Sequence, residues 1–293
     1  MIIRKYKVFL KAAELGNLTK TGEVMGYTQS GVSHMMKSLE DEVGFSLFAR
    51  GSKGITLTAN GEKILPIVRR LLDSNEQLEQ TVSSINGLVS GNICIGSFSS
   101  TSTHWLPRII KNFQADYPMV NISILEGGIQ EIAGWLSEGI ADIGFCSRQG
   151  HLSFDWIPLK QDPMLAVLPK DHPLEDGKPF PIKEFNGSPF IMSAPGFDYD
   201  IHRVLDDNNV TADIKFSSKD DYAIVSMVAN NLGFSILPEL VLLWCAGHVK
   251  LAELQPGAYR ELGIAVPSLK NVPPAVRKFL DYTVRILTRD NLI

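Results

Sequence analysis

The sequence predicts two fold classes in one chain: an all-α N-terminal part that ends in a β-hairpin and a long helix, and a larger two-lobed α/β part. Three observations lead to this prediction. Apolar residues recur at helical spacing in the first 45 residues, a heptad pattern follows, and short apolar strands alternate with amphipathic helices from about residue 91. We expect residues 1–58 to form the first domain, 59–90 a linking helix and 91–293 the α/β domain.

The composition is that of a globular protein, with 44% hydrophobic and 20% charged residues. The longest apolar runs fall far short of the roughly 20 residues that span a bilayer. Charged residues interrupt the N-terminal apolar stretch, which excludes the core of a signal peptide; they are Arg4, Lys5, Lys7 and Lys11. We therefore expect a cytoplasmic protein.

Charge is distributed unevenly along the chain. Residues 1–70 carry 11 Lys and Arg against 6 Asp and Glu, whereas the other 223 residues carry 17 against 26. A basic first quarter on an acidic remainder is typical of a nucleic-acid-binding head on a body that is kept away from phosphates.

The three cysteines show neither CxxC spacing nor clustered histidines, so no metal site, disulfide framework or cofactor is expected. Buried free thiols are the favoured interpretation. A redox-sensing pair of Cys94 and Cys146, both near the ends of expected strands, is the alternative.

Three short helices are expected in the first 44 residues. The first has an apolar face formed by Tyr6, Phe9, Leu10 and Ala13. Thr19 is expected to cap the second helix, Thr28 to cap the third, and Gly44 to end the third. This order predicts a helix-turn-helix, whose second helix enters the major groove of DNA.

The outward face of the third expected helix carries side chains that can pair with base edges or phosphates. They are Thr28, Gln29, Ser30, Ser33, His34 and Lys37. An ordinary solvated helix face would look similar. The following segment, FSLFARGSKGITLT, predicts a hairpin with Arg50 and Lys53 at its tip. A basic hairpin in this place is typical of a wing that contacts the DNA backbone, so double-stranded DNA is the expected partner.

A long helix is expected from residue 59 to about residue 90. Its apolar positions are spaced alternately by four and three, and the central positions are Val68, Leu71, Asn75, Leu78, Val82 and Ile85. Valine at position a with leucine at position d favours a two-stranded pair, and a single Asn at position a fixes its register. The pattern predicts a homodimer; packing of the helix against its own chain is the alternative.

The segment TQSGVSHMMKSLEDEVGFSLFARGSKGITLTANGEKIL resembles the LysR-type transcriptional regulators. The shared positions are Thr28-Gln29, Val32-Ser33, Leu39-Glu40, Gly44, Leu47-Phe48, Arg50, Leu57-Thr58 and Gly61. Thr21-Gly22 departs from the two alanines usual in the family. The resemblance implies a DNA-binding regulator that responds to a small molecule. It also implies antiparallel pairing of the linking helices, where the heptad itself favours parallel pairing, a tetramer built from two dimers, and RNA polymerase as a candidate partner.

Two α/β lobes are expected after residue 90. The first spans about 91–161 and 266–293, and the second about 162–265. Two crossings of the chain between the lobes predict a hinged cleft like that of periplasmic binding proteins. LPRIIKNFQADYP, GIADIGF and DHPL also resemble the effector domain of the LysR family.

The expected effector-binding residues lie where strands end and helices begin. They are Ser97, Ser99, Ser100 and Thr101 from the first lobe, with Ile129, and Ser193, Phe197 and His202 from the second. The hydroxyls suit a carboxylate or another small polar anion, although capping would explain one or two of them. By resemblance, Ile129 stands where some relatives carry a ligand-binding Thr.

Two other classes of function fit less well. An enzyme would need a constellation such as a G-x-S-x-G elbow, a P-loop or a dinucleotide fingerprint, and the sequence contains none of these. A stand-alone binding protein would account for the two lobes, but would leave the basic head and the heptad pattern unexplained.

Overall fold

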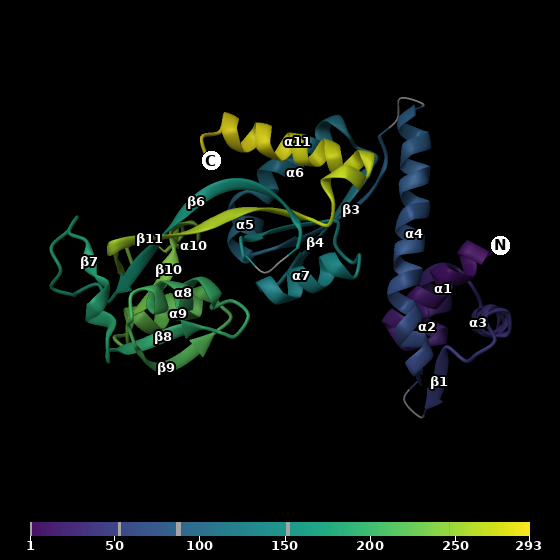
Figure 1. Cartoon of the computed structure of the whole chain (residues 1–293), viewed down its shortest axis with the longest axis horizontal. Helices are drawn as coiled ribbons and strands as arrows, with labels where there is room; N and C mark the ends of the chain where they lie inside the picture. The colour runs from purple at the N-terminus through teal and green to yellow at the C-terminus, as the bar shows by residue number, and fades with distance from the viewer. Residues whose placement is uncertain (1, 52–53, 86–88, 151–152, 246) are drawn as a thin grey trace. The chain divides into compact units, whose positions relative to one another are not determined.

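The computed structural model describes residues 2–51, 54–85, 89–150, 153–245 and 247–293. The chain forms two units: the first comprises Met1–Val89 with Glu138–Ile140, and the second comprises Ser90–Ser137 and Ala141–Ile293. Each unit is described by itself below, with the elements labelled in Figure 1. None of the described helices is long and apolar enough to cross a membrane.

The first unit is built on three helices, α1 (Ile2–Leu15), α2 (Leu18–Met25) and α3 (Gln29–Val43). Their shared core includes Val8, Phe9, Val32 and Leu39, which are fully buried. Thr28 caps α3, since its hydroxyl accepts a hydrogen bond from Gly31 N at 3.1 Å, and Gly44 ends the helix with a φ of 83°. Both predictions are confirmed.

The prediction that Thr19 caps α2 is wrong. Asn17 begins that helix, and its side-chain oxygen accepts hydrogen bonds from the backbone N–H groups of Thr19 and Lys20 at 2.9 and 3.0 Å. Asn is among the best capping residues, and it occupies the extended backbone conformation that an N-cap requires. Helix α2 therefore begins before the position that a Thr19 cap would have set.

A hairpin follows α3 and consists of β1 (Phe48–Gly51) and β2 (Gly54–Leu57), which pair in antiparallel register. Glu40 fixes its start, because one carboxylate oxygen accepts the N–H groups of Leu47 and Phe48 at 2.7 and 3.1 Å. At Gly54 the backbone has a φ of 128°, and an added Cβ would lie 2.4 Å from the carbonyl oxygen of Gly16. Only glycine allows this close approach without a shift.

Helix α4 spans Ala59–Ile85 and begins at Thr58, whose hydroxyl accepts from Gly61 N at 3.0 Å. Val68 and Leu72 pack into the core of the first unit and are almost fully buried. The first half of α4 thus packs against its own chain, which was the alternative interpretation. Val68 is therefore not available for pairing with a second copy.

The second half of α4 carries a stripe of exposed apolar residues. The stripe consists of Leu71, Leu78, Val82 and Ile85, which are between 42% and 80% exposed, and Ile67 precedes it. Asn75 lies within the stripe and donates a hydrogen bond to Glu79 of its own helix at 2.9 Å. The predicted last turn, towards residue 89, includes residues outside the described ranges.

A mixed sheet of seven strands forms the body of the second unit (Figure 1). Its hydrogen-bonded order is β10 (Ser235–Pro238), β6 (Asp155–Leu168), β11 (Lys250–Val266), β5 (Ile143–Ser147), β3 (Gly91–Ser97) and β4 (Val120–Glu126), with β7 (Phe180–Pro181) paired to β11. The helices of the first lobe are α5 (Ser99–His104), α6 (Leu106–Asp116), α7 (Ile129–Ser137) and α11 (Pro274–Arg289). Strands β3, β4 and β5 are parallel, as strand–helix–strand patterns predict.

The two strands that cross between the lobes are longer than their sequence patterns predict. Strands β6 and β11 pair antiparallel from Asp155 with Val266 to Leu168 with Lys250, interrupted by two register shifts. The sequence predicts only about half of each as strand, because prolines and charged residues break the alternation. The rest of each strand is stabilised by hydrogen bonds to neighbouring strands, and sequence propensity does not take these into account.

The second lobe adds β8 (Pro189–Ser193) and β9 (Asp213–Ser218), which pair in parallel, and the helices α8 (Tyr199–Asp207), α9 (Asp221–Ala229) and α10 (Glu239–Leu242). The 3₁₀ helices are η1 (Ile182–Phe185) in this lobe and η2 (Leu269–Asn271) before α11. One large apolar cluster fills this lobe, and aromatic rings such as Phe180, Phe185 and Phe190 are fully buried in it. The helix predicted directly after β3 is divided at Trp105 into α5 and α6, where Pro107 occupies the first turn of α6.

Candidate functional sites

The face of α3 opposite its core presents the predicted DNA-contacting side chains to solvent. Gln29, Ser30, His34 and Lys37 are exposed and Ser33 is half-buried. The hydroxyls of Thr28 and Ser30 lie 3.1 Å apart and share a hydrogen bond. Thr28 is also the N-cap of α3, so its side chain already serves the fold. The structure leaves the amide of Gln29 accessible at the helix N-terminus, where a base edge or phosphate can reach it.

Lys5 holds α3 against α1, a contact that the sequence pattern did not reveal. Its ammonium group donates to the hydroxyl of Ser38 at 2.8 Å and forms an ion pair with Glu42. Lys5 is almost buried, with 9% of its surface exposed, so it belongs to the scaffold of this unit despite its charge. Lys5 is therefore one of the basic residues in the first 70 positions that is unavailable to DNA.

Gly22 of α2 lies against the turn that joins α2 to α3. A Cβ at this position would lie 2.6 Å from the carbonyl oxygen of Tyr27, in the turn between α2 and α3. Tyr27 N in turn donates to Gly22 O at 2.8 Å. The missing methyl group therefore lets the turn pack directly on α2 rather than loosening the helix.

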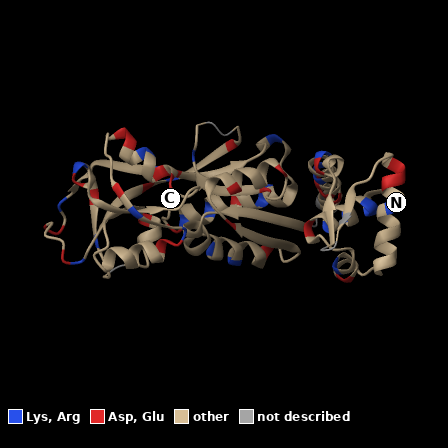
Figure 2. Cartoon of the chain, turned by 90° about the horizontal axis from the view of Figure 1, so that it is seen from below, with Lys and Arg blue, Asp and Glu red and all other residues tan. Residues whose placement is uncertain are grey.

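The two wing residues fall largely outside the described part of the chain. The backbone of Arg50 lies in β1, opposite Ile55. Lys53 lies outside the described residues. In the view of Figure 2, charges of both signs are spread over the second unit.

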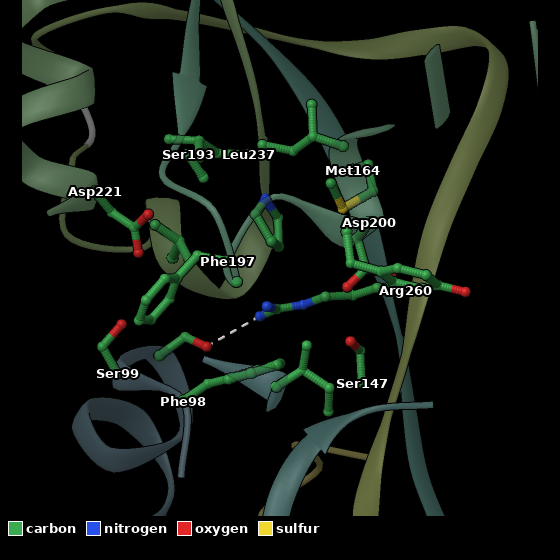
Figure 3. Close-up of a pocket in the computed structure, with 17 residues that line it drawn as sticks. Phe98, Ser99, Ser147, Met164, Ser193, Phe197, Asp200, Asp221, Leu237 and Arg260 are labelled. Carbon is green, nitrogen blue, oxygen red and sulfur yellow. Dashed lines mark hydrogen bonds between the residues drawn. The ribbon is translucent and has the colours of Figure 1, made fainter. Parts of the chain in front are cut away.

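A cavity opens between the two lobes of the second unit (Figure 3). Both lobes and both crossing strands line it. The lining residues are Phe98, Ser99, Ser100, Ile129, Ser147, Met164, Ser193, Gly196, Phe197, Tyr199, Asp200, Ile201, Asp221, Leu237, Pro238, Val241 and Arg260.

A buried ion pair joins the two crossing strands at the cavity. Arg260 of β11 and Asp162 of β6 are register partners, and Nε and Nη2 of Arg260 both lie 2.8 Å from Oδ2 of Asp162. Asp162 is fully buried and also accepts the N–H of Leu240 at 3.1 Å. Arg260 Nη2 donates to Ser100 Oγ at 3.0 Å, which links the hinge to the first lobe. These charges are paired and hydrogen-bonded, as burial demands.

Two further carboxylates face the cavity. Burial raises the pKa of Asp221 to about 6, while Arg260 and a hydrogen bond with Ser99 oppose the rise and Asp220 adds to it. Asp200 lies at the start of α8, where Arg203 of the same helix approaches it to 3.5 Å. In Figure 3, Asp221 lies beyond the guanidinium end of the Arg260 side chain, and Asp200 lies beside its aliphatic part.

Five of the predicted effector residues line the cavity: Ser99, Ser100, Ile129, Ser193 and Phe197. The other three do not, and the structure gives the reason for each. Ser97 and Thr101 are buried behind the lining, where their hydroxyls share a hydrogen bond at 2.6 Å and both lie within 3.0 Å of Phe98 O. His202 is exposed on α8 and lies 3.3 Å from Asp198, one turn earlier.

The charged residues of the cavity were not foreseen from the sequence. They are Asp162, Asp200, Asp221 and Arg260, and they are separated by up to 98 positions along the chain. One signal was present, since Arg260 stands at the start of the expected strand RELGIAVP and Asp162 directly precedes the expected strand PMLAVLP. A charge in such a place is buried only when a partner is supplied.

The cysteines are free thiols, with Cys146 and Cys245 buried and Cys94 half-buried. Burial raises the pKa of Cys146 to about 12 and also raises that of Cys94. Both thiols are therefore protonated at neutral pH, which disfavours the redox-pair interpretation. Among the described residues no cluster of His, Cys, Asp and Glu could hold a metal ion.

Comparison with known proteins gives a consistent result. A family model for the LysR substrate binding domain matches residues 86–287, and one for the bacterial regulatory helix-turn-helix protein of the lysR family matches residues 3–62. The chain is 32% identical over 284 residues to YvbU of Bacillus subtilis (strain 168), an uncharacterized HTH-type transcriptional regulator, covering 96% of this chain and 97% of YvbU.

The chain belongs to the LysR family. Solved structures share its fold. A full-length OxyR variant from Pseudomonas aeruginosa has a TM-score of 0.75 at 20% identity, over 97% of this chain and 94% of that one. CbnR complexed with its target DNA has a TM-score of 0.68 at 19% identity, over 98% and 100%. By its two family models and its relatives, this LysR-family protein is a DNA-binding transcriptional regulator with an effector-binding domain.

Proposed function

We propose that an effector bound in the cavity between the lobes controls how this LysR-family regulator acts on its operator in the cytoplasm. One observation carries the proposal. The cavity is lined by residues of both lobes and of both crossing strands, including Met164 on β6 and Arg260 on β11. A ligand that contacts all four elements binds the closed and open arrangements with different affinity, which is the condition for a conformational response.

The proposed effector contacts are the hydroxyls of Ser99, Ser100 and Ser193 with the ring of Phe197 and the side chain of Ile129. Ser100 has a special place among them, because it already accepts a hydrogen bond from Arg260 of the hinge pair. A ligand that takes over this bond would act directly on the pair of strands that joins the lobes.

The test uses the full chain and a duplex enriched from random-sequence DNA by the wild-type protein. A panel of small carboxylates, sugars and amino acids is screened by thermal stability, and compounds that stabilise the protein are measured by calorimetry. Replacing Ser99 and Ser100 together with alanine should abolish the effector response and leave DNA affinity within about twofold, since distant sites are independent.

The matched control replaces two exposed serines of the second lobe, Ser217 and Ser226, with alanine. This control should keep the effector affinity of the wild type. Unchanged effector binding in the Ser99 and Ser100 variant would mean that the ligand lies elsewhere, and the proposed site would be abandoned.

We further propose that Gln29 and Ser33 read base edges, that Arg50 and Lys53 contact the DNA backbone, and that two copies pair through α4. The stripe of Leu71, Leu78, Val82 and Ile85 supports the pairing, since contiguous apolar surface on a soluble helix is normally covered. A dimer supplies the two reading helices that a two-fold operator requires.

A further inference from the structure

The charges around the cavity do not balance. Arg260 is the cation of the lining, and the fully buried Asp162 already neutralises it at 2.8 Å. Asp200 has Arg203 at 3.5 Å. For Asp221, no ammonium or guanidinium group of the described residues lies within ion-pair distance. The lining therefore presents one acid that has no ion-pair partner among the described residues.

Closure of the lobes makes this imbalance more costly. Asp221 begins α9, is half-buried, and faces the cavity that Ser99 of the opposite lobe also lines. Burial raises its pKa to about 6, so near neutral pH the carboxyl group is close to exchanging its proton. A ligand that excludes more water must either leave this group protonated or bring a cation to it.

The remainder of the lining selects for an apolar body with an accepting end. Phe98, Ile129, Phe197 and Leu237 form apolar walls. Arg260 and Ser100 supply hydrogen-bond donors from the side of the hinge, and Asp221 lies beyond the guanidinium end of Arg260 in Figure 3. A carboxylate fits the donors and an ammonium group fits Asp221.

We propose that the effector is an amino acid or close analogue with an apolar side chain, whose protonated amine pairs with Asp221 and whose carboxylate binds Ser100 and Arg260. The inference rests on the proposed function, because it assigns the ligand of the same cavity. It differs from the expectation of a simple anion, for which Asp221 would be repulsive unless protonated.

The experiment compares matched probes on the full chain by calorimetry at pH 7. L-Leucine, L-methionine and L-phenylalanine are each titrated beside the same compound without its amine: 4-methylpentanoate, 4-(methylthio)butanoate and 3-phenylpropanoate. At least one amino acid should bind, and at least tenfold more tightly than its deaminated partner. If none of the three binds, or if the deaminated compounds bind equally well, the proposal is wrong.

Two variants identify the residue responsible. Asp221→Asn should lose at least tenfold in affinity for the bound amino acid, with the deaminated partner unchanged or bound more tightly. Asp220→Asn neutralises the adjacent acid outside the cavity lining, and Asn can still accept the N–H of Tyr222 as an N-cap, so this control should bind within about twofold of wild type. Equal losses of affinity in the two variants would show that the effect comes from the net charge of this region. That result would overturn the pairing of the amine with Asp221.

The pH dependence gives an independent readout. An amine must displace the proton of Asp221, so its affinity should rise about tenfold from pH 5 to pH 7 and the rise should vanish in Asp221→Asn. An anionic ligand would show the opposite slope. Other groups near Asp221 are Arg260, Asp220, Cys245 and, across the adjoining recess, Lys219 and His104. Burial lowers the pKa of His104, so a His104→Gln variant separates its titration from that of Asp221.

The outcomes distinguish the class of ligand from the location of the site. If an anion without an amine binds the wild type and loses affinity in the Ser99 and Ser100 variant, the proposed pairing of an amine with Asp221 is refuted. The proposed location of the effector site in the cavity then still holds. Amino acid binding that is indifferent to both the serine pair and Asp221 would refute both.

Discussion

On α3 the candidate DNA contacts come from residues 28–37 of one helix, and most of them reach solvent. The effector cavity takes its lining from residues 98 to 260, and Arg260 in that lining is buried and bonded to Asp162, which lies 98 positions away along the chain. An exposed side chain on α3 can be exchanged without disturbing the fold. A charged residue at the cavity affects both ligand binding and the stability of the fold. The first kind of site is a pattern along the chain, and the second is a product of distant contacts.

The buried hinge pair gives the largest expected effect. Asp162→Ala leaves the guanidinium of Arg260 without its partner in a site where Arg260 is only 6% exposed. The free energy of unfolding of the second unit should fall by about 3–5 kcal/mol, because an uncompensated buried charge remains. All four tryptophans lie in this unit, so their fluorescence in urea reports it within the full chain.

A surface pair provides the control for that measurement. Arg148 and Glu261 lie 3.3 Å apart, and Arg148 is well exposed. Arg148→Ala should cost at most about 1 kcal/mol. Similar losses in Asp162→Ala and Arg148→Ala would remove the distinction between a buried and an exposed ion pair in this protein.

Asp221 should destabilise the folded chain at neutral pH. Its pKa rises from 3.8 in a free side chain to about 6 in the fold, so between about pH 4 and pH 6 the folded state holds a proton that the unfolded state has lost. Stability therefore decreases as pH rises through this window. Asp221→Asn should match wild type near pH 4 and exceed it by up to about 2–3 kcal/mol above pH 6. Parallel pH curves for the two proteins would contradict the shift.

Gln29→Ala tests the reading face. Operator affinity should fall by roughly 1–3 kcal/mol, while affinity for random duplex DNA changes far less, since base contacts specify and phosphate contacts position. Lys53→Ala should weaken both about equally. Gln114→Ala, an exposed glutamine on α6, should change neither. Gel retardation that shows equal losses of Gln29→Ala on both DNAs would contradict base reading.

The smallest change in fold stability is expected on the α4 stripe, where the effect is on assembly. Leu71→Asp places a charge on the exposed apolar face and should convert dimers to monomers at micromolar concentration, as light scattering would show. Asn60→Asp introduces the same charge at the exposed first turn of α4 and should leave the mass unchanged. Wild-type monomers would refute pairing through α4.

The sequence by itself determined the elements whose signals are local. Helix α3 is bounded by Thr28 and Gly44, whose capping geometry depends only on neighbouring residues, and the amphipathic periods of α1, α6 and α11 mark their buried faces. The serines at the end of β3 and the start of α5 were recognisable for the same reason, as polar residues directly after an apolar strand.

Tertiary structure alone decided which of those residues face the cavity. Ser99 and Ser100 line it, while Ser97 and Thr101 bond to each other behind it, although the four are neighbours in sequence. The pairing of Asp162 with Arg260 and the burial of Asp221 likewise depend on how β6, β11 and α9 come together. A charge is favourable or costly according to its surroundings, and those surroundings are set by residues far away along the chain.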